Sequence, residues 1–281
     1  MRIGMKRFQD FNRLLYGETN GRINGRQLYK ALTSEEYGTL LSLLLHEKVR
    51  LRWLAAARLG KIGDERAVDP LINALQDSHW LVRLHAAKAL GRLKSQKGIK
   101  PLVGLLNDNN AYVRRRVVSS ISQLNTNKDD YVIEVLISAL NDSDRVVRAR
   151  SAWVLGNFVS STSIRAIAVA VLDPDLNVSW RAIDSLQKIG VAAVPALVGL
   201  LEAHDSEVRY RAVKTLGKIR DVRAVQPLEN MLNDPVQKVR QRAKYAIHQI
   251  KHPLFKYQPS QTPKPILEMA RNMWNKLWKR S

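Results

Sequence analysis

The chain has 281 residues, and its 45% hydrophobic and 25% charged residues are the balance of a protein that buries a core. Its 46 Lys and Arg against 25 Asp and Glu leave a net charge of +21, which points to a polyanionic partner: nucleic acid, an anionic membrane surface or an acidic protein. The absence of cysteine excludes disulfides, thiol catalysis and cysteine-ligated metal centres, and agrees with a reducing compartment.

Residues 1–36 lack the regular pattern of the rest of the chain. The segment 5–16 places Phe8, Phe11 and Leu15 at helical spacing, which predicts a basic N-terminal segment that caps the first repeat. The start lacks the apolar run of a signal peptide, and no stretch approaches the roughly 18 consecutive apolar residues of a membrane-spanning helix. We therefore expect a cytoplasmic protein whose contact with a membrane, if any, is peripheral.

Residues 37–250 contain an internal repeat with a period near 31 residues. Each copy has a short apolar helix (A), a turn containing Asp, Asn or Ser, and a longer helix (B) that follows an apolar anchor residue. Apolar side chains recur four, five, eight and eleven positions after the anchor, which predicts stacked helical hairpins that bury one face. The anchors are Leu51, Val82, Val113, Val147, Val178, Val208 and Val239.

The pattern within each unit resembles a known repeat family. The A helix contains P-L-x-x-L-L, as at 101–106, and the B helix reads V-R-x-x-A-A-x-A-L-G, as at 82–91. Across residues 37–250 this resembles HEAT repeats of the phycobilisome-lyase-like type. The resemblance implies an all-α fold, a right-handed α-solenoid of about seven hairpins. Because proteins with this repeat include bilin lyases, phycobilisome-degradation factors and binding scaffolds, the resemblance predicts the fold and leaves the function open.

Two positions of the unit predict a repeated ion pair. We expect the arginine after each anchor to pair with the aspartate of its own turn, so that Arg148 pairs with Asp142. Asp173 should be free or turned to solvent, because Ser179 replaces the arginine of its unit. These arginines are therefore interpreted as structural. They are Arg52, Arg83, Arg114, Arg148, Arg209 and Arg240, and the aspartates are Asp77, Asp108, Asp142, Asp173 and Asp234.

The third position after the anchor predicts a binding surface, because five successive units carry arginine there. Aromatic residues and lysines lie two and six positions after the anchor, on the same side of the helix. We expect these side chains to line the concave side and to bind carboxylates, phosphates or flat rings. The alternative is that the arginines are only solvated and that each Trp lies across a neighbouring B helix. The predicted partner-binding residues are Arg116, Arg150, Arg181, Arg211, Arg242, Trp153, Trp180, Tyr210, Tyr245, Lys88 and Lys214.

Residues 251–281 depart from the repeat. Prolines predict a linker at 251–265, and residues 266–281 predict a basic amphipathic helix. Such a helix is typical of contact with an anionic membrane or of docking in a partner's groove, and folding back on the last repeat is the alternative. The residues predicted to make this contact are Trp274, Trp278, Lys276, Lys279 and Arg280.

The sequence carries none of the common catalytic motifs, and its histidines do not pair at metal-ligand spacing on one helix. We therefore predict no catalytic residues, no metal and no cofactor. The function we predict is a non-catalytic scaffold that binds an acidic protein partner through its basic, aromatic-lined concave face. One alternative is a bilin lyase-like or bilin-chaperone protein that acts on phycobiliproteins and holds a bilin. Nucleic-acid binding is the second alternative.

Overall fold

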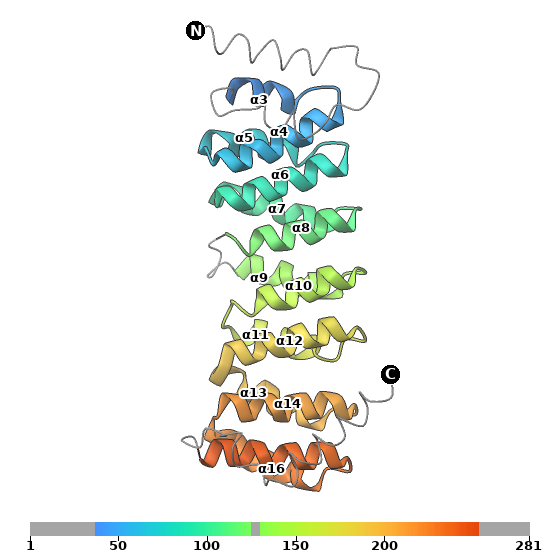
Figure 1. The fold of residues 1–281 in the computed structure, drawn as a ribbon, viewed down its shortest axis with the longest axis vertical. Helices are drawn as coiled ribbons and strands as arrows, with labels where there is room; N and C mark the ends of the chain where they lie inside the picture. Colours follow the sequence, from blue (N-terminus) through green and yellow to red (C-terminus); the bar gives the residue numbers. More distant parts are fainter. Residues whose placement is uncertain (1–36, 125–129, 253–281) are drawn as a thin grey trace, which may run out of the picture.

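The computed structural model describes residues 37–124 and 130–252. The predicted N-terminal cap, the linker and the C-terminal helix with Trp274 and Trp278 lie outside the described residues, apart from the first two residues of the linker. Within the described ranges the chain forms only α-helices, short 3-10 helices and turns, stacked as seven hairpins in a single column (Figure 1). The predicted all-α solenoid is confirmed.

Each hairpin pairs a shorter A helix with a longer B helix. The A helices are α3 (Tyr37–Leu44), α5 (Val68–Ala74), α7 (Ile99–Gly104), α9 (Asp130–Ser138), α11 (Ser161–Ala170), α13 (Val194–Gly199) and α15 (Val225–Asn230). The B helices are α4 (Val49–Ile62), α6 (Trp80–Leu93), α8 (Ala111–Ile121), α10 (Arg145–Leu155), α12 (Leu176–Ile189), α14 (Ser206–Ile219) and α16 (Gln237–Lys251).

Short 3-10 helices extend most A helices. Those that precede an A helix are η2 (Glu65–Ala67), η3 (Gln96–Gly98), η6 (Gly190–Ala193) and η8 (Val222–Ala224). Those that follow one are η4 (Leu105–Asn107), η5 (Ala139–Asn141), η7 (Leu200–Glu202) and η9 (Met231–Asn233). Five of the seven B helices begin at a residue whose side chain caps them: Asp144, for example, accepts hydrogen bonds from the backbone N–H groups of Val146 and Val147. Such a cap contributes about 1 kcal/mol and sets where the helix starts.

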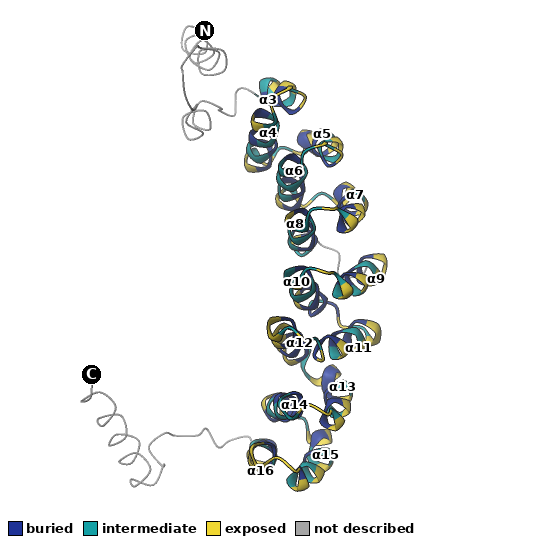
Figure 2. Cartoon of the chain, turned by 90° about the vertical axis from the view of Figure 1, so that its right-hand side faces the viewer, coloured by how far each residue is buried: buried dark blue, intermediate teal, exposed yellow. Residues whose placement is uncertain are grey.

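The two helices of each hairpin form two layers with the core between them. Figure 2 shows the A helices on the outside of a shallow arc and the B helices on its concave side, as the sequence predicts. The residue eight positions after the anchor is buried in the first six units, and Leu59, Leu90, Leu155, Leu186 and Leu216 are fully buried. Truncating such a leucine to alanine costs about 2–5 kcal/mol, so this layer holds the solenoid together.

The run Leu176–Glu202 is long and apolar enough, by length and composition alone, to cross a membrane. It joins α12 of one hairpin to α13 of the next. Leu186 and Leu197, one from each helix, are fully buried in the solenoid. We therefore assign the apolar character of this run to core packing.

An arginine–aspartate ladder joins neighbouring hairpins at five of the six contacts between them. Arg148 donates from Nε to Oδ2 of Asp173, in the following turn, at 2.7 Å, and from Nη1 to the backbone carbonyl of Asp142, in its own turn, at 2.9 Å. The expected pairing of Arg148 with the Asp142 carboxylate is therefore wrong, although the ladder itself is present. The other pairs are Arg52–Asp77, Arg83–Asp108, Arg114–Asp142 and Arg209–Asp234.

Where the ladder is interrupted, both the arginine and the aspartate that would pair with it are replaced. Ser179 replaces the arginine of one unit, and Ala203 occupies the aspartate position of the next turn. Asp173 is not free, contrary to the expectation, because its carboxylate pairs with Arg148 of the preceding hairpin. Ser179 is buried and donates from Oγ to the carbonyl of Val171 at 2.7 Å. The ladder therefore loses a donor and its acceptor together, and no carboxylate is stranded.

Candidate binding groove on the concave face

Small residues determine how closely neighbouring B helices approach. In four of the six joints between B helices, a glycine faces a small residue of the next helix so closely that a Cβ on it would lie 2.5–2.8 Å from its neighbour. The facing pairs are Gly60 and Ala89, Gly91 and Ser120, Gly156 and Ser185, and Gly217 and Ala246. The glycine is replaced at the other two joints, by Ser122 in α8 and by Gln187 in α12. The α8–α10 and α12–α14 pairs pack less closely than the other four.

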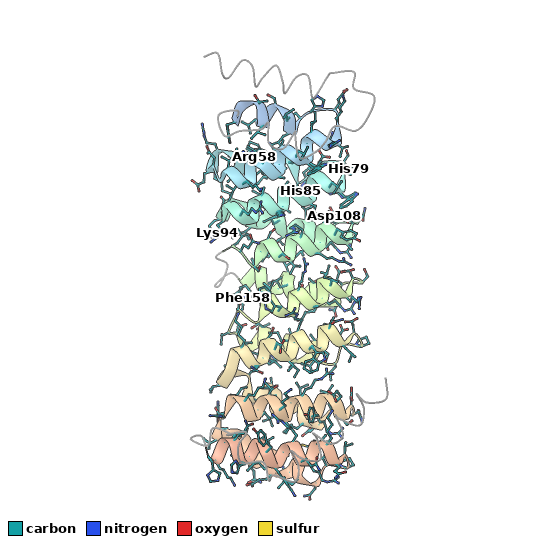
Figure 3. The ribbon with its side chains drawn as sticks, in the orientation of Figure 1. Arg58, His79, His85, Lys94, Asp108 and Phe158 are labelled. Carbon is teal, nitrogen blue, oxygen red and sulfur yellow. The ribbon has the colours of Figure 1, made fainter. Side chains whose placement is uncertain are left out.

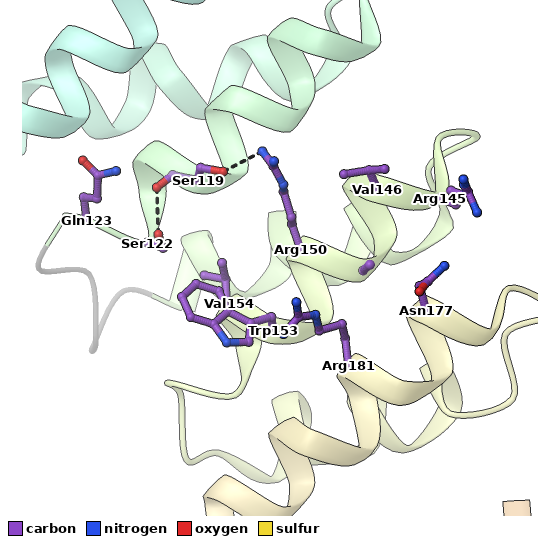
Figure 4. Close-up of a pocket in the computed structure, with 11 residues that line it drawn as sticks. Ser119, Ser122, Gln123, Arg145, Val146, Arg150, Trp153, Val154, Asn177 and Arg181 are labelled. Atoms are coloured by element: carbon purple, nitrogen blue, oxygen red, sulfur yellow. Dashed lines mark hydrogen bonds between the residues drawn. The ribbon is translucent and has the colours of Figure 1, made fainter. Parts of the chain in front are cut away.

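Two open hollows lie at the widened α8–α10 joint. The larger has a volume of about 650 Å³ and is lined from α8, α10 and α12 (Figure 4). The second has a volume of about 550 Å³ and lies at the C-terminal ends of these helices. Both are lined by Ser122 and Gln123, so they adjoin each other, and we call the two together the α8–α10 groove. Its described lining contains no acidic residue and includes Lys94, Arg145, Arg150, Arg181 and Lys188.

Arg150 bridges the α8–α10 joint. It is half-buried and donates from Nη1 to the carbonyl of Arg115 at 2.7 Å and to Oγ of Ser119 at 2.8 Å, both in α8. Figure 4 shows its side chain pointing toward Ser119. Burial, and then the charge of Arg115, lower the pKa of Arg150. This arginine therefore braces the joint as well as lining the groove, which the sequence did not predict.

Arg211 bridges the second widened joint, α12–α14, and fills it. Its side chain is 5% exposed, its Nη1 donates to Oγ of Ser179 at 2.8 Å, and its guanidinium carbon lies 4.4 Å from the centre of the Trp180 ring. The prediction that Arg211 faces the solvent on the concave side is therefore wrong. Its guanidinium lies against the start of α12, at the pair of B helices that pack least closely.

Three of the predicted aromatic residues are exposed on the concave face. Trp153, Trp180 and Tyr245 have exposed fractions of 44%, 43% and 39%. Tyr210 is half-buried, and Nζ of Lys238 lies 4.2 Å from the centre of its ring. Rings with one face open to solvent provide area for a partner.

The remaining predicted arginines differ in burial. Arg181 is exposed, and it extends from α12 toward Trp153 of α10 (Figure 4). Arg242 is half-buried, with its guanidinium carbon 4.8 Å from the centre of the Tyr245 ring. The two predicted lysines, Lys88 and Lys214, are also half-buried.

Arg116 lies close to other cations of the concave face. It is half-buried, and its Nε is buried without a hydrogen-bond partner among the described residues. Burial, and then the charges of Arg150 and Arg92, lower the pKa of Arg116. A bound anion would relieve this repulsion, because an opposite charge nearby favours the charged form of the guanidinium.

His85 occupies in α6 the position that these arginines occupy in later units. Its ring stacks on that of Trp53, with centroids 4.8 Å apart. Burial, and then the charges of Lys88, Arg116 and Arg92, lower the pKa of His85 to about 4. His85 is therefore neutral near pH 7 and adds no charge to the concave face.

Several lining residues were missed by the sequence analysis. Ser122, Gln123, Asn157, Lys94 and Lys188 lie near the C-terminal ends of B helices, outside the positions singled out there. The signal that could have located them is Ser122 itself, which stands where most units carry the small glycine. The arginines at the third position after the anchor indicate which face of the solenoid is basic. The replacement of a glycine indicates where two B helices stand far enough apart to leave a groove on that face.

Comparisons with known proteins extend this description. A family model described as HEAT repeats matches residues 38–130, 133–193 and 191–248. The bilin biosynthesis protein PecE of Nostoc sp. (strain PCC 7120) is 33% identical over 110 residues, which cover 35% of this chain and 43% of that protein. The match therefore spans less than half of the relative's length.

One solved structure agrees in fold. An engineered protein is 20% identical, with a TM-score of 0.50 over 86% of this chain and 77% of its own. The complex of CpcE and CpcF of phycocyanin lyase from Nostoc sp. PCC7120 is 22% identical, with a TM-score of 0.49 over 84% of this chain and 98% of that chain. At these identities the likeness concerns the fold alone.

Proposed function

The chain belongs to the HEAT-repeat family, and on that premise we propose that it is a scaffold that binds an acidic protein partner through its concave face. The observation that carries the proposal is the α8–α10 groove, whose described lining has five Arg or Lys residues and no acidic one. Exposed Trp153 lies in the same lining. Arginine binds carboxylates through two parallel N–H donors, and an adjacent aromatic ring adds apolar contact area.

The charges of the groove are only partly neutralised within the protein. Arg145 contacts Asp175 at 3.2 Å, whereas Arg150 donates to a carbonyl and a hydroxyl, which carry no charge. Arg181 makes no ion pair with any described residue and is exposed. An acidic partner would therefore find uncompensated cations already held in place, which raises both its association rate and its specificity.

The experiment compares Arg181→Glu with the wild-type protein in a pull-down of acidic proteins from native lysate, quantified by mass spectrometry. We expect the charge reversal to remove most of the bound acidic proteins, with the melting temperature unchanged because Arg181 is exposed. Arg165→Glu is the matched control, since Arg165 is an exposed residue of the convex helix α11. Equal capture by all three proteins would show that the concave face is not the binding surface.

A bilin lyase-like or bilin-chaperone role is the second candidate, favoured by the match to a protein named for bilin biosynthesis. A flat tetrapyrrole with carboxylate side chains suits an exposed Trp beside arginines. The test is an absorbance titration of the wild-type protein and of Trp153→Ala with a linear tetrapyrrole. A spectral shift that Trp153→Ala weakens supports the role, and the absence of any shift in the wild type contradicts it.

A further inference from the structure

We propose that the acidic partner enters the α8–α10 groove as an extended peptide segment, running from Arg181 and Trp153 to Lys188 and Lys94. This inference rests on the proposed function and names the form of the partner. The peptide would pass from one hollow to the other beside Ser122 and Gln123, which line both. We call these two residues the waist of the groove. At the closed joints a glycine faces an alanine or a serine. Here Ser122, directly after α8, faces Val154 of α10, and the larger side chains keep the two helices apart.

The two edges of the concave face differ in charge compensation. Figure 3 shows His79 and Asp108 at the edge formed by the turns, and Lys94 and Phe158 at the opposite edge, formed by the C-terminal ends of the B helices. At the turn edge the ladder aspartates neutralise the arginines, as Asp108 does for Arg83.

At the C-terminal edge two lysines have neutral acceptors, whereas Lys251 at the end of α16 pairs with Glu229 at 3.0 Å. Lys188 donates from Nζ to Oδ1 of Asn157, and Lys218 donates to Oε1 of Gln187 at 2.9 Å. An amide oxygen holds a lysine in place without cancelling its charge. The groove therefore leads from the arginines of α10 and α12 to Lys188, which a neutral amide holds in place, and to the exposed Lys94. It complements a chain with several carboxylates along its length.

Amide side chains in the groove favour a peptide over a single-stranded nucleic acid. Gln123 and Asn177 each offer a donor and an acceptor, as a peptide unit does, and Asn157 offers its N–H donors, whereas a phosphate backbone offers acceptors only. Trp153 is the only aromatic residue in the described lining, while binding of successive bases uses several stacked rings. We infer an extended peptide, because its backbone N–H and C=O groups are open to hydrogen bonds with these amides, whereas a helix satisfies most of its own.

The test is fluorescence anisotropy with a labelled ten-residue peptide of alternating Asp and Ser. Ser122→Phe places a ring at the waist without changing any charge. Gln187→Phe makes the same type of change at the equivalent position of the other widened joint, which Arg211 fills. We expect Ser122→Phe to weaken binding at least about tenfold and Gln187→Phe to change it less than about twofold. Equal affinities of Ser122→Phe and the wild type would overturn the peptide path.

A second pair of variants keeps the inference testable if Ser122→Phe fails to fold. The double variant Lys94→Ala with Lys188→Ala alters the groove end, and Lys218→Ala with Lys251→Ala removes the same charge from the edge beyond it. We expect only the first pair to weaken the peptide by about tenfold. An oligothymidylate of equal charge should bind more weakly than the peptide, and tighter binding of the oligonucleotide would overturn the choice of a peptide.

Failure of this inference is distinguishable from failure of the proposed function. If Ser122→Phe and the Lys94, Lys188 variant both bind the peptide as the wild type does, while Arg181→Glu still loses acidic proteins in the pull-down, only the path along the groove is wrong. If Arg181→Glu leaves the pull-down unchanged, the proposed function itself is wrong.

Discussion

The joint between α4 and α6 and the joint between α8 and α10 use the same repeat and differ by a few side chains. At the first joint Gly60 lies against Ala89 so closely that a Cβ would be 2.5 Å from its backbone. At the second, Ser122 and Val154 occupy these two positions, and an open groove results. The comparison teaches that in this solenoid a local loss of close packing makes the binding surface, while the cores of both joints stay buried.

The largest expected effect comes from breaking the closed joint. Gly60→Ala should destabilise the protein by about 2–3 kcal/mol, because the new methyl group overlaps the backbone of α6 and rigid helices must separate. Urea unfolding measures the change. Gly104→Ala is the control, because nothing lies within 4 Å of the place its methyl group would take, and alanine favours the helix. Unfolding of Gly60→Ala at the wild-type urea concentration would show that close contact does not hold this joint.

Breaking one arginine–aspartate pair of the ladder should reduce the free energy of unfolding nearly as much, and it shows which hairpins the pair connects. Arg148→Ala strands the Asp173 carboxylate, whose side chain is 10% exposed, and should cost about 2 kcal/mol. A double-mutant cycle measured by urea unfolding should give strong coupling of Arg148 with Asp173 and little with Asp142, because Arg148 reaches only the backbone of Asp142. Stronger coupling to the carboxylate of Asp142 would contradict the pairing between hairpins.

Replacing a buried arginine of the B helices should destabilise the protein more than replacing an exposed one. Arg211→Ala should cost about 2 kcal/mol, because it empties the α12–α14 gap and leaves the buried Ser179 with one hydrogen bond fewer. Arg181→Ala should change stability by less than about 0.5 kcal/mol, because that side chain is exposed. Thermal unfolding of both variants checks this, and equal losses would mean that burial does not distinguish them.

The smallest expected effect is a pH dependence at the α6–α8 joint. The pKa of His85 is lowered to about 4 in the folded protein, from 6.5 in an ordinary histidine. The unfolded chain therefore binds the proton first, and stability is lost as the pH falls from about 6.5 toward 4, by about 1 kcal/mol near pH 5.5. His85→Phe should flatten the unfolding free energy over that window. An unchanged pH profile in the variant would assign the dependence to other groups.

Much of the fold could be predicted from the sequence, because apolar spacing and a 31-residue period leave few ways to bury the same face in every unit. The ladder could be predicted in kind but not in pairing. The arginine after an anchor lies near both its own turn and the next one, and only the stacking of hairpins brings the carboxylate of the following turn to Nε. Arg148 shows this, since it contacts Asp142 and Asp173 in different ways.

The binding surface was predicted only as a helix face. The B helices line the concave side, and Trp153, Trp180, Tyr245 and Arg181 are exposed there, as predicted. The burial of Arg211 could not be read from its position in the repeat, because it depends on how far α12 and α14 stand apart. Use of the exposed set for partner binding stays a prediction.

By itself the sequence determined the α-helical hairpins, their number, the core positions and the strongly basic balance, because each of these follows from local spacing and composition. Only the tertiary structure decided which aspartate each ladder arginine reaches, which arginines are buried, and where the concave face opens. Those outcomes depend on distances between helices that are far apart in the chain. At α8–α10 that distance follows the replacement of a glycine by Ser122 and of a small facing residue by Val154, and the pair has meaning only once α10 lies against α8.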